Sequence, residues 1–369
     1  MTISQRRDRL RQRLKSDGLD AMLVTRLVNV RYLSGFTGSN AALLIRADDD
    51  TPVLATDGRY RTQAAQQVPD AEIVIERACG PYLTGRAAAD GARRLGFESH
   101  VVTVEGFDGL AKEARDTELV RAAGTVEALR EVKDAGEVAL LRLACEAADA
   151  ALADLVEGGG LRPGRTEREV GRQLESLMLD HGADGVSFET IVATGVNSAI
   201  PHHRPTDAVL AAGDFVKIDF GALVCGYHSD MTRTFVLAPA AQWQLDLYEL
   251  VAAAQRAGRE AVEPGVALRD VDAASRRVIA DAGYADNFTH GLGHGVGLEI
   301  HEAPGISASA AGTLLAGSAV TVEPGVYLPD RGGVRIEDTL VVCEAEPPGR
   351  RHQTSDLLTQ FPKELTILS

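Results

Sequence analysis

The stretch DFVKIDFGALV (residues 214–224), followed by GYHSDMTRTFVL (226–237), has the pattern of two β-strands that pair with each other. SAVTVEPGVYL (318–328) and GGVRIEDTLVV (332–342) repeat this pattern later in the chain. Each of the two strand pairs carries two candidate acids, one in each strand segment. The repeat therefore predicts two similar halves, each of which contributes two carboxylates.

A helix with the same kind of beginning precedes each strand pair. One Pro-Gly pair (163–164) comes before RTEREVGRQLESLML (165–179), and a second (264–265) comes before VALRDVDAASRRVIA (266–280). Two halves of the form helix–helix–hairpin predict an α+β domain with an internal pseudo-two-fold repeat, in which the four acids meet at one central point. The alternative is a chance resemblance between two amphipathic stretches.

The acids in these strands indicate a metal centre. Asp219 lies between Ile218 and Phe220, and burying an acid among apolar residues without a partner is costly. One such acid is often satisfied by a hydrogen bond in the core, but two acids in each of two hairpins fit that alternative poorly. Two divalent ions, about 3.5–4 Å apart, balance four carboxylates, hold one hydroxide and polarise a carbonyl. The predicted metal ligands are Asp219, Asp230, His294, Glu323 and Glu337.

The imidazole ligand belongs to the glycine-rich stretch HGLGHGVGLEIHE (290–302). His290 and His294 have the spacing of neighbours on a helix, but the four glycines around them disfavour a helix and predict a strand or loop. The spacing fits neither a dinucleotide-binding fingerprint nor an H-E-x-x-H zinc motif. A lone histidine is more often a core or surface residue, but three histidines in this stretch favour a site.

Further candidates lie outside the ligand set. His202 and His203 are neighbours on an extended chain, so at most one of them is expected to face the site. His202 and His301 are candidates for stabilising the developing oxyanion and for protonating the leaving nitrogen. Arg335 precedes Glu337 by two positions and therefore shares its strand face, where its charge orients acidic ligands. The alternative for Arg335 is a side chain that faces solvent.

The composition is that of a globular protein long enough for two domains: 369 residues, of which 45% are hydrophobic. A formal charge of −15 argues against a nucleic-acid partner. No apolar run has the length of a membrane span. The basic N-terminus predicts an amphipathic surface helix, with Ile3, Leu10 and Leu14 facing inward, rather than a signal peptide. Four cysteines without a C-x-x-C pair indicate reduced thiols in a cytoplasmic protein.

The change in pattern near residue 125 divides the chain into an α/β domain (1–125) and a second domain (126–369), which opens with a long helical stretch over Val126–Val156. Within the first domain, strands are expected at 21–24, 41–45, 52–56 and 72–76, and helices at 59–68 and 84–95.

At these motifs the chain resembles the proline-specific metallopeptidases of the pita-bread (creatinase/prolidase) family. NVRYLSGFTGSNAALLI (29–45) and LATDGRY (54–60) are similar to the amino-terminal domain of that family, so the resemblance covers nearly the whole chain. It implies a creatinase-like α/β domain with a mixed sheet, followed by a pita-bread catalytic domain.

The resemblance also implies a role for each matching residue. Asp219 binds one metal ion, His294 and Glu323 belong to the second, and Asp230 and Glu337 bridge the two. Two ions are implied, usually Mn²⁺ or Co²⁺ and sometimes Zn²⁺, and the oxygen-rich ligands themselves suit Mn²⁺. The implied catalytic residues are His202, His301, Glu323 and Arg335, and the implied substrate-binding residues are His202, His290, His301 and Tyr327.

Within the family, aminopeptidase P and Xaa-Pro dipeptidase (prolidase) are the two activities to consider, with proline-containing peptides as substrates. Several dipeptidases have an arginine after the H-E-x-P element that meets the terminal carboxylate of the substrate, whereas this chain has Gly305 in HEAPG. This difference favours aminopeptidase P, with the dipeptidase as the alternative and a non-catalytic pita-bread binding module as a remote one. The family commonly forms homodimers or homotetramers, and the same is expected here.

Overall fold

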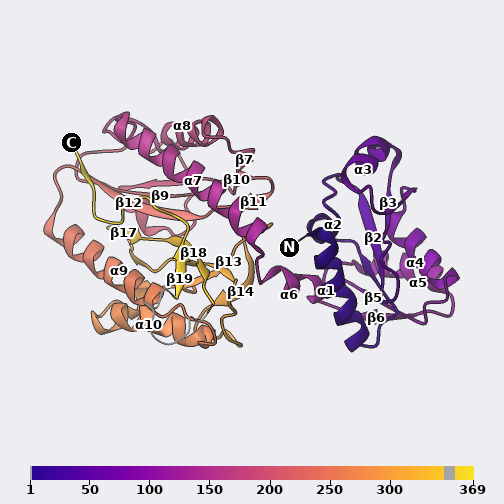
Figure 1. The fold of residues 1–369 in the computed structure, drawn as a ribbon. Coiled ribbons are helices and arrows are strands. Elements are labelled where there is room, and N and C mark those ends of the chain that lie inside the picture. Colours follow the sequence, from indigo (N-terminus) through magenta and orange to yellow (C-terminus); the bar gives the residue numbers. More distant parts are fainter. Residues whose placement is uncertain (1, 345–353) are drawn as a thin grey trace. The chain divides into compact units, whose positions relative to one another are not determined.

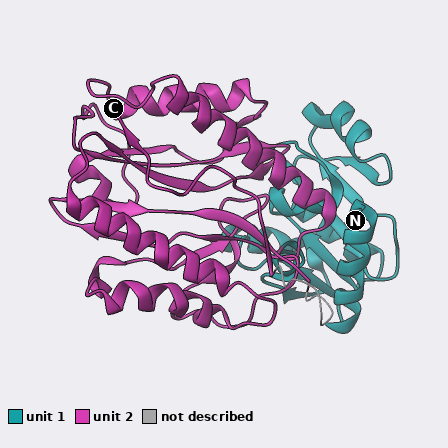
Figure 2. Cartoon of the chain, turned by 60° about the vertical axis from the view of Figure 1, so that its left-hand side comes forward, with its two compact units in different colours: residues 1–130 teal, residues 131–369 magenta. Residues whose placement is uncertain are grey.

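The computed structural model describes residues 2–344 and 354–369, which form two compact units, residues 1–130 and residues 131–369 (Figure 2). Each unit has its own sheets and its own buried apolar residues. In the described part of the chain, no helix is both long and apolar enough to span a membrane.

The smaller unit is built on a six-stranded mixed sheet with the order β4-β3-β2-β1-β5-β6. β1 pairs antiparallel with β2, and β2 with β3, while the other three pairings are parallel. The expectation of an α/β domain with a mixed sheet is therefore confirmed. The strands are β1 (Ala21–Val24), β2 (Ala41–Arg46), β3 (Val53–Thr56), β4 (Glu72–Ile75), β5 (Arg94–Phe97) and β6 (Glu118–Arg121). The helices before residue 125 are α1 (Ile3–Ser16), α2 (Leu27–Ser34), α3 (Arg61–Gln67), α4 (Cys79–Ala89) and α5 (Val104–Ala114).

Two expected elements of this unit differ from the structure in detail. On α1, Leu10 and Leu14 are buried as expected, whereas Ile3 is only half-buried. The expected helix at 84–95 is wrong at both ends, because α4 begins at Cys79 and residues from Arg94 onward form β5. Gly91 has a positive φ of 88° just after the helix, which is a conformation that ends helices and suits glycine.

The long helix expected over 126–156 is two helices. α6 (Thr125–Arg130) closes the smaller unit, and α7 (Ala135–Glu157) opens the larger one. Asp134 starts α7, since its side chain accepts hydrogen bonds from the backbone N–H groups of Gly136 and Glu137. Glu137 bonds back to the N–H of Asp134 and completes a capping box, a signal that the run of Ala, Leu and Glu concealed.

The larger unit has the two expected halves. In the first half, helices α7 and α8 (Glu167–Asp180) cover a sheet of order β20-β12-β9-β8. Helices α9 and α10 cover the second half, whose sheet has the order β14-β13-β15-β18-β19. Figure 1 shows the two helix pairs on opposite sides with the strands between them. The paired strands of the first half are β8 (Ile191–Thr194), β9 (Phe215–Phe220), β12 (Met231–Leu237) and β20 (Ile367–Leu368). The second half contains α9 (Gln242–Glu260), α10 (Leu268–Asp281), β13 (Gly293–Gly295), β14 (Glu302–Ile306), β15 (Ala319–Val322), β18 (Asp338–Val342) and β19 (Ser355–Leu357).

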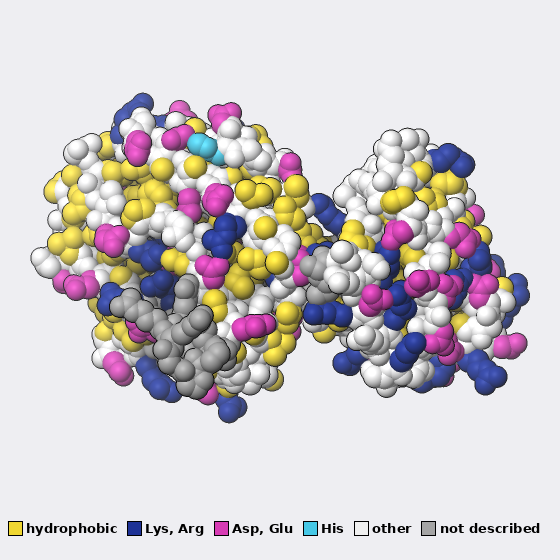
Figure 3. Space-filling view, viewed as in Figure 1, with side chains coloured by type: hydrophobic (Ala, Val, Ile, Leu, Met, Phe, Trp, Pro, Cys, Tyr) yellow, Lys and Arg dark blue, Asp and Glu magenta, His cyan; other side chains and the backbone are white. Residues whose placement is uncertain are grey.

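Short hairpins complete this unit: β7 (Gly185–Val186), β10 (Ala222–Val224) and β11 (Tyr227–His228) form one sheet, and β16 (Gly325–Leu328) pairs with β17 (Gly332–Arg335). Apolar side chains from each helix pair and the sheet beneath it form a separate cluster in each half. This burial holds the strands that carry the acids in place. On the face seen in Figure 3, basic and acidic side chains are interspersed rather than gathered by sign.

Candidate metal centre

The four acids lie at corresponding places in the two halves. Asp219 is on β9 and Asp230 directly precedes β12, its antiparallel partner. Glu323 directly follows β15, and Glu337 directly precedes β18, which is again the antiparallel partner. All four side chains line one pocket with a volume of about 270 Å³, and His294 lines it as well. The structure therefore brings together all five predicted ligands.

His294 lies on a strand that packs so closely against its neighbours that only glycine fits on either side of the histidine. A Cβ atom on Gly293 would lie 2.0 Å from the carbonyl oxygen of Thr321, and one on Gly295 would lie 2.1 Å from that of Ala303. β13 therefore packs between its neighbours at a distance that excludes side chains on either side of His294. The expectation of a glycine-rich strand instead of a helix is confirmed.

The imidazole of His294 is set up as a neutral ligand. Nδ1 lies 3.0 Å from the carbonyl oxygen of Gly295, which only accepts hydrogen bonds, so Nδ1 carries the proton. Nε2 then presents its lone pair to Asp230 and Glu323, at 3.5 Å from a carboxylate oxygen of each. Burial lowers the pKa of His294 to about 4, which keeps the ring uncharged at neutral pH.

The carboxylates lie so close together that cations would stabilise them. Burial raises the pKa values of Asp230 and Glu337 well above the usual range, and each is raised further by neighbouring carboxylates. Burial also raises the pKa of Glu323 to about 8, although Arg335 opposes it. Asp219 Oδ1 is enclosed and has no hydrogen-bond partner in the described structure. One ligand atom each from Asp230, His294 and Glu337 lies within 4.8 Å of the others. Hard oxygen donors with one imidazole, an orphaned oxygen and mutual repulsion all fit divalent ions.

Arg335 is buried beside these acids and does not face solvent. Its Nη2 donates to Asp219 Oδ2, and its Nε lies 2.9 Å from Thr232 Oγ1 and 4.0 Å from a carboxylate oxygen of Glu323. Nη1 donates to the hydroxyl of Tyr327 at 2.9 Å. The side chain thus holds Asp219 in orientation while it adds one positive charge to the site.

Tyr327 and His290 continue this chain of hydrogen bonds. The Nδ1 of His290 lies 2.8 Å from the carbonyl of Gly291 and so carries the proton, and Nε2 accepts from the Tyr327 hydroxyl at 2.8 Å. Burial lowers the pKa of His290 to about 4 and raises that of Tyr327 to about 12, so both are neutral. Neither is among the described residues that line the pocket. Of the four predicted substrate-binding residues, these two are thus linked to Arg335 by hydrogen bonds, whereas His202 and His301 line the pocket.

His202 and His203 both line the pocket, so the expectation that at most one of them faces the site is wrong, but the two differ in their anchoring. His203 Nε2 lies 2.8 Å from a carboxylate oxygen of Glu167, which is fully buried and also accepts hydrogen bonds from the loop around it. His202 lies close enough to His301 that its charge lowers the pKa of that ring, after the larger effect of burial. The rings of His301 and His294 meet edge to face at 4.4 Å.

The loop that carries His202 is held by buried cations as well. Lys217 Nζ donates to the carbonyl of Ile200 at 2.6 Å, and Arg335 Nη1 donates to that of Pro201 at 3.1 Å. Sequence reasoning missed Lys217 and Glu167. A signal existed for Lys217, since it is a lysine in the same apolar run as Asp219 and two positions before it.

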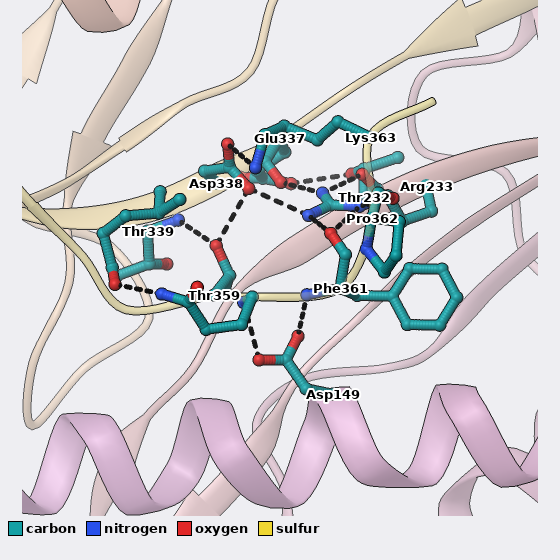
Figure 4. Close-up of polar contacts among 12 residues, drawn as sticks. Asp149, Thr232, Arg233, Glu337, Asp338, Thr339, Thr359, Phe361, Pro362 and Lys363 are labelled. Atoms are coloured by element: carbon teal, nitrogen blue, oxygen red, sulfur yellow. Dashed lines mark hydrogen bonds and ion pairs between the residues drawn. The ribbon is translucent and has the colours of Figure 1, made fainter. Parts of the chain in front are cut away.

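A third group of buried residues joins the ligand strands. Thr232 Oγ1 donates to Glu337 Oε2 at 2.7 Å. Arg233, which is 2% exposed, donates to the main-chain carbonyls of Thr232 and Glu337 and forms a 2.9 Å ion pair with Asp338 (Figure 4). Its guanidinium also reaches the carbonyl of Phe361 at 2.7 Å. This group fixes the spacing between Asp230 and Glu337, and sequence reasoning missed it.

The remaining wall of the pocket combines apolar and charged side chains. Phe188, Ile191 and Ile300 supply apolar surface. Arg204 also lines the pocket, and its Nε lies 3.1 Å from a carboxylate oxygen of Glu189. Both partners are largely exposed, at 82% and 62%, so their ion pair is weak and exchangeable.

The sequence pattern of metallopeptidase family M24 matches residues 139–344, which is more than half of the chain and contains all five candidate ligands. The protein belongs to metallopeptidase family M24. The pattern of the creatinase/prolidase N-terminal domain matches residues 6–132 of this M24 peptidase. The resemblance to pita-bread proline peptidases is therefore confirmed, and so is the expectation of a hydrolase.

Similar proteins cover this M24 peptidase along almost its entire length. An Xaa-Pro dipeptidase of Pyrococcus horikoshii is 34% identical over 332 residues, which are 90% of this chain and 92% of the relative. The solved structure of an Xaa-Pro dipeptidase from Bacillus anthracis superposes with a TM-score of 0.92, at 38% identity and 100% coverage of both chains. That of an X-Pro aminopeptidase from Thermotoga maritima superposes with a TM-score of 0.88, at 33% identity, covering 98% of this chain and 99% of the other.

Proposed function

We propose that this M24 peptidase is an Xaa-Pro dipeptidase that depends on two divalent metal ions. The observation that carries the proposal is Arg204, an exposed cation in the wall of the carboxylate pocket. A dipeptide places its terminal carboxylate one residue from the scissile bond, and that carboxylate can replace the exposed Glu189 on the guanidinium. The dipeptidases among the similar proteins support the same conclusion.

The absence of an arginine at position 305 favoured aminopeptidase P in the sequence, but the relatives support the dipeptidase better. Gly305 lies on β14 and lines a different cavity from the carboxylates. Aminopeptidase P is kept as the second candidate, because one similar solved structure is an X-Pro aminopeptidase. In that case Arg204 would meet the Pro-Yaa peptide bond, since the proline of such a substrate has no free carboxylate.

The five ligands are proposed to hold the two ions, of which Mn²⁺ suits the oxygen-rich set best and Co²⁺ or Zn²⁺ are alternatives. When bound, the ions activate water for attack and polarise the scissile carbonyl. His202 donates to the oxyanion that develops, and His301 lies beside it for the same task. Glu323 takes the proton released by the attacking water and passes it to the proline nitrogen as the Xaa-Pro bond breaks. Arg335 keeps Asp219 in orientation and balances its charge.

Proline recognition has to rely on shape, since the imide nitrogen of an Xaa-Pro bond carries no N–H group. The apolar side chains of Phe188, Ile191 and Ile300 offer a surface on which the ring can pack. A pocket of about 270 Å³ is small, which fits a short substrate better than a long one.

The decisive test offers the Mn²⁺-loaded protein an Xaa-Pro dipeptide and an Xaa-Pro-Yaa tripeptide together and follows the products by mass spectrometry. We expect the dipeptide to be cleaved to two free amino acids. Cleavage of the tripeptide alone, to free Xaa and Pro-Yaa, would contradict the dipeptidase and establish the aminopeptidase. Cleavage of neither peptide by metal-loaded protein would contradict both.

We further propose that the protein acts in the cytoplasm on proline-containing peptides as a homodimer or homotetramer. The family resemblance supports this assembly, and size-exclusion chromatography with light scattering tests it. A mass equal to that of one 39.1 kDa chain would contradict the proposal.

A further inference from the structure

The larger unit contains a second cavity, of about 470 Å³, which is separate from the carboxylate pocket. Helix α9 forms one wall and residues 363–365 form another. Ile336 lines this cavity, whereas its neighbour Glu337 lines the carboxylate pocket. The two cavities therefore lie on different sides of the chain segment that contains Ile336 and Glu337.

Positive charge outnumbers negative charge at the inner end of this cavity. Asp338 is fully buried and lies 3.3 Å from Lys363 Nζ and 3.9 Å from Arg259 Nε. The same carboxylate already has Arg233 at 2.9 Å (Figure 4), and it accepts a hydrogen bond from Gln255 at 2.7 Å. One acid thus faces three cations, and its oxygens are largely used by Arg233 and Gln255.

Arg259 is the least satisfied of these cations. Its side chain is only 28% exposed, and its Nε is enclosed without a hydrogen-bond partner. Among residues 2–344 and 354–369, no oxygen accepts a hydrogen bond from any nitrogen of this guanidinium. A guanidinium has five N–H donors, and enclosed donors are nearly always paired in folded proteins. Arg259 lines the cavity, and its Nη atoms are not among the enclosed atoms of the described structure, so a ligand in the cavity can accept hydrogen bonds from them.

The pKa of Lys363 is affected by the same excess of positive charge. Burial lowers the pKa of its ammonium group, and Arg233 and Arg259 lower it further against the opposing effect of Asp338. Arg256 also lines the cavity and adds a third cation to the wall. An anion in the cavity would offset repulsion among these groups.

The rest of the lining defines what kind of anion fits. Glu249 and Glu364 are exposed acids of the lining, and neither forms an ion pair with the three cations in the described structure. The remaining lining is mostly apolar and includes Tyr248. It is completed by Leu245, Ala252, Ile336 and Leu365. This lining suits a molecule with an anionic group at one end and a compact apolar body at the other.

We propose that this cavity is a binding site for a small organic anion. Its carboxylate or phosphate group accepts hydrogen bonds from Arg259 and Lys363, and its apolar part packs against Tyr248 and Leu365. Charge-assisted hydrogen bonds of this kind are the strong ones, and Arg259 has no protein hydrogen bond to give up, only the 3.9 Å contact with Asp338. The site is independent of the peptidase reaction proposed above.

Isothermal titration calorimetry on the full, Mn²⁺-loaded chain tests the proposal with phenyl phosphate and benzoate as probes. We expect one-to-one binding of at least one probe, and the stronger of the two identifies the phosphate or the carboxylate class. Arg259→Gln should weaken binding about tenfold or more, the effect of losing a hydrogen bond to a charged group. Arg277→Gln removes an exposed charge of α10 outside the cavity and should leave binding unchanged.

An anion that binds at the metal centre is the main competing outcome, and Asp230→Asn separates the two. Binding that persists in Asp230→Asn and is lost in Arg259→Gln supports the cavity. Binding that is lost in Asp230→Asn and persists in Arg259→Gln overturns it, and so does the absence of binding of both probes at millimolar concentration. Arg259→Lys keeps the charge without the planar donors and should retain part of the affinity, which guards against a folding defect in the glutamine variant.

Discussion

Without its metal ions, the larger unit should lose stability as the pH rises, and Glu323 should be a main cause of this loss. In the protein without metal, burial raises the pKa of Glu323 from an ordinary 4.5 to about 8. As pH rises, the unfolded chain loses this proton first, while the folded protein retains it up to about pH 8. The folded state binds more protons in that window, so its stability falls between about pH 4.5 and pH 8.

The magnitude follows from the same two values. The difference between 4.5 and about 8 corresponds to roughly 5 kcal/mol, at about 1.4 kcal/mol per pH unit. Asp230 and Glu337 share protons with Glu323, because the charge of Glu323 raises the pKa values of both of these buried acids. We therefore expect Glu323→Gln alone to recover about 2–3 kcal/mol at high pH, since glutamine stays neutral.

Guanidinium chloride unfolding in the presence of a chelator measures this effect at about pH 5 and about pH 9. The single tryptophan, Trp243, lies on α9, so its fluorescence reports on the larger unit alone. Glu260→Gln, an exposed substitution on the same helix, is the matched control and should change little at either pH. Equal stability of Glu323→Gln and the parent protein at about pH 9 would refute the reasoning, as would a gain that is as large at about pH 5.

Three further substitutions test the site. Asp230→Asn should abolish peptide hydrolysis and lower the bound metal while the fold persists, as measured by product analysis, metal analysis and Trp243 fluorescence; full activity would contradict the ligand set. Arg204→Ala should lower kcat/KM about tenfold or more for an Xaa-Pro dipeptide and leave its C-terminal amide unaffected, because only the free carboxylate needs the cation; an equal loss on both would contradict that role. Arg233→Met should destabilise the larger unit by about 3 kcal/mol in chemical unfolding, because it removes the shortest ion pair of the buried Asp338 together with the hydrogen bonds to three main-chain carbonyls. Paired with Asp338→Leu, much of that loss should be recovered, and no loss in the single variant would contradict the network.

Much of the architecture could be predicted because its signals are local. The acids inside apolar strands, the glycines around His294 and the Pro-Gly pairs before α8 and α10 each mark their element in a few residues. The repeat then related the two halves without any knowledge of long-range contacts. The division between α6 and α7 was missed because the capping role of Asp134 is hidden in a run of strong helix formers.

The residues that support the site were harder to predict, because their function depends on partners far along the chain. Arg233 bonds to carbonyls at Glu337 and Phe361, more than a hundred positions away, and nothing near Arg233 in the sequence indicates them. Glu167 sits in the first turn of α8, where an acid is expected for the helix alone, yet it also anchors His203. Gly305 was linked to specificity by a family motif in the sequence. Arg204 could be recognised as a candidate only from the structure, which shows that it lines the pocket.

The distribution of the ligands along the chain has a consequence for biosynthesis. Asp219 and Asp230 precede Glu337 by more than a hundred positions, and the carbonyl of Phe361, which accepts a hydrogen bond from Arg233, lies further along the chain. A nascent chain that has reached only the first half therefore has two of the five candidate ligands and lacks the partners that the second half supplies. Metal loading has to wait until both halves have been synthesised and have folded against each other.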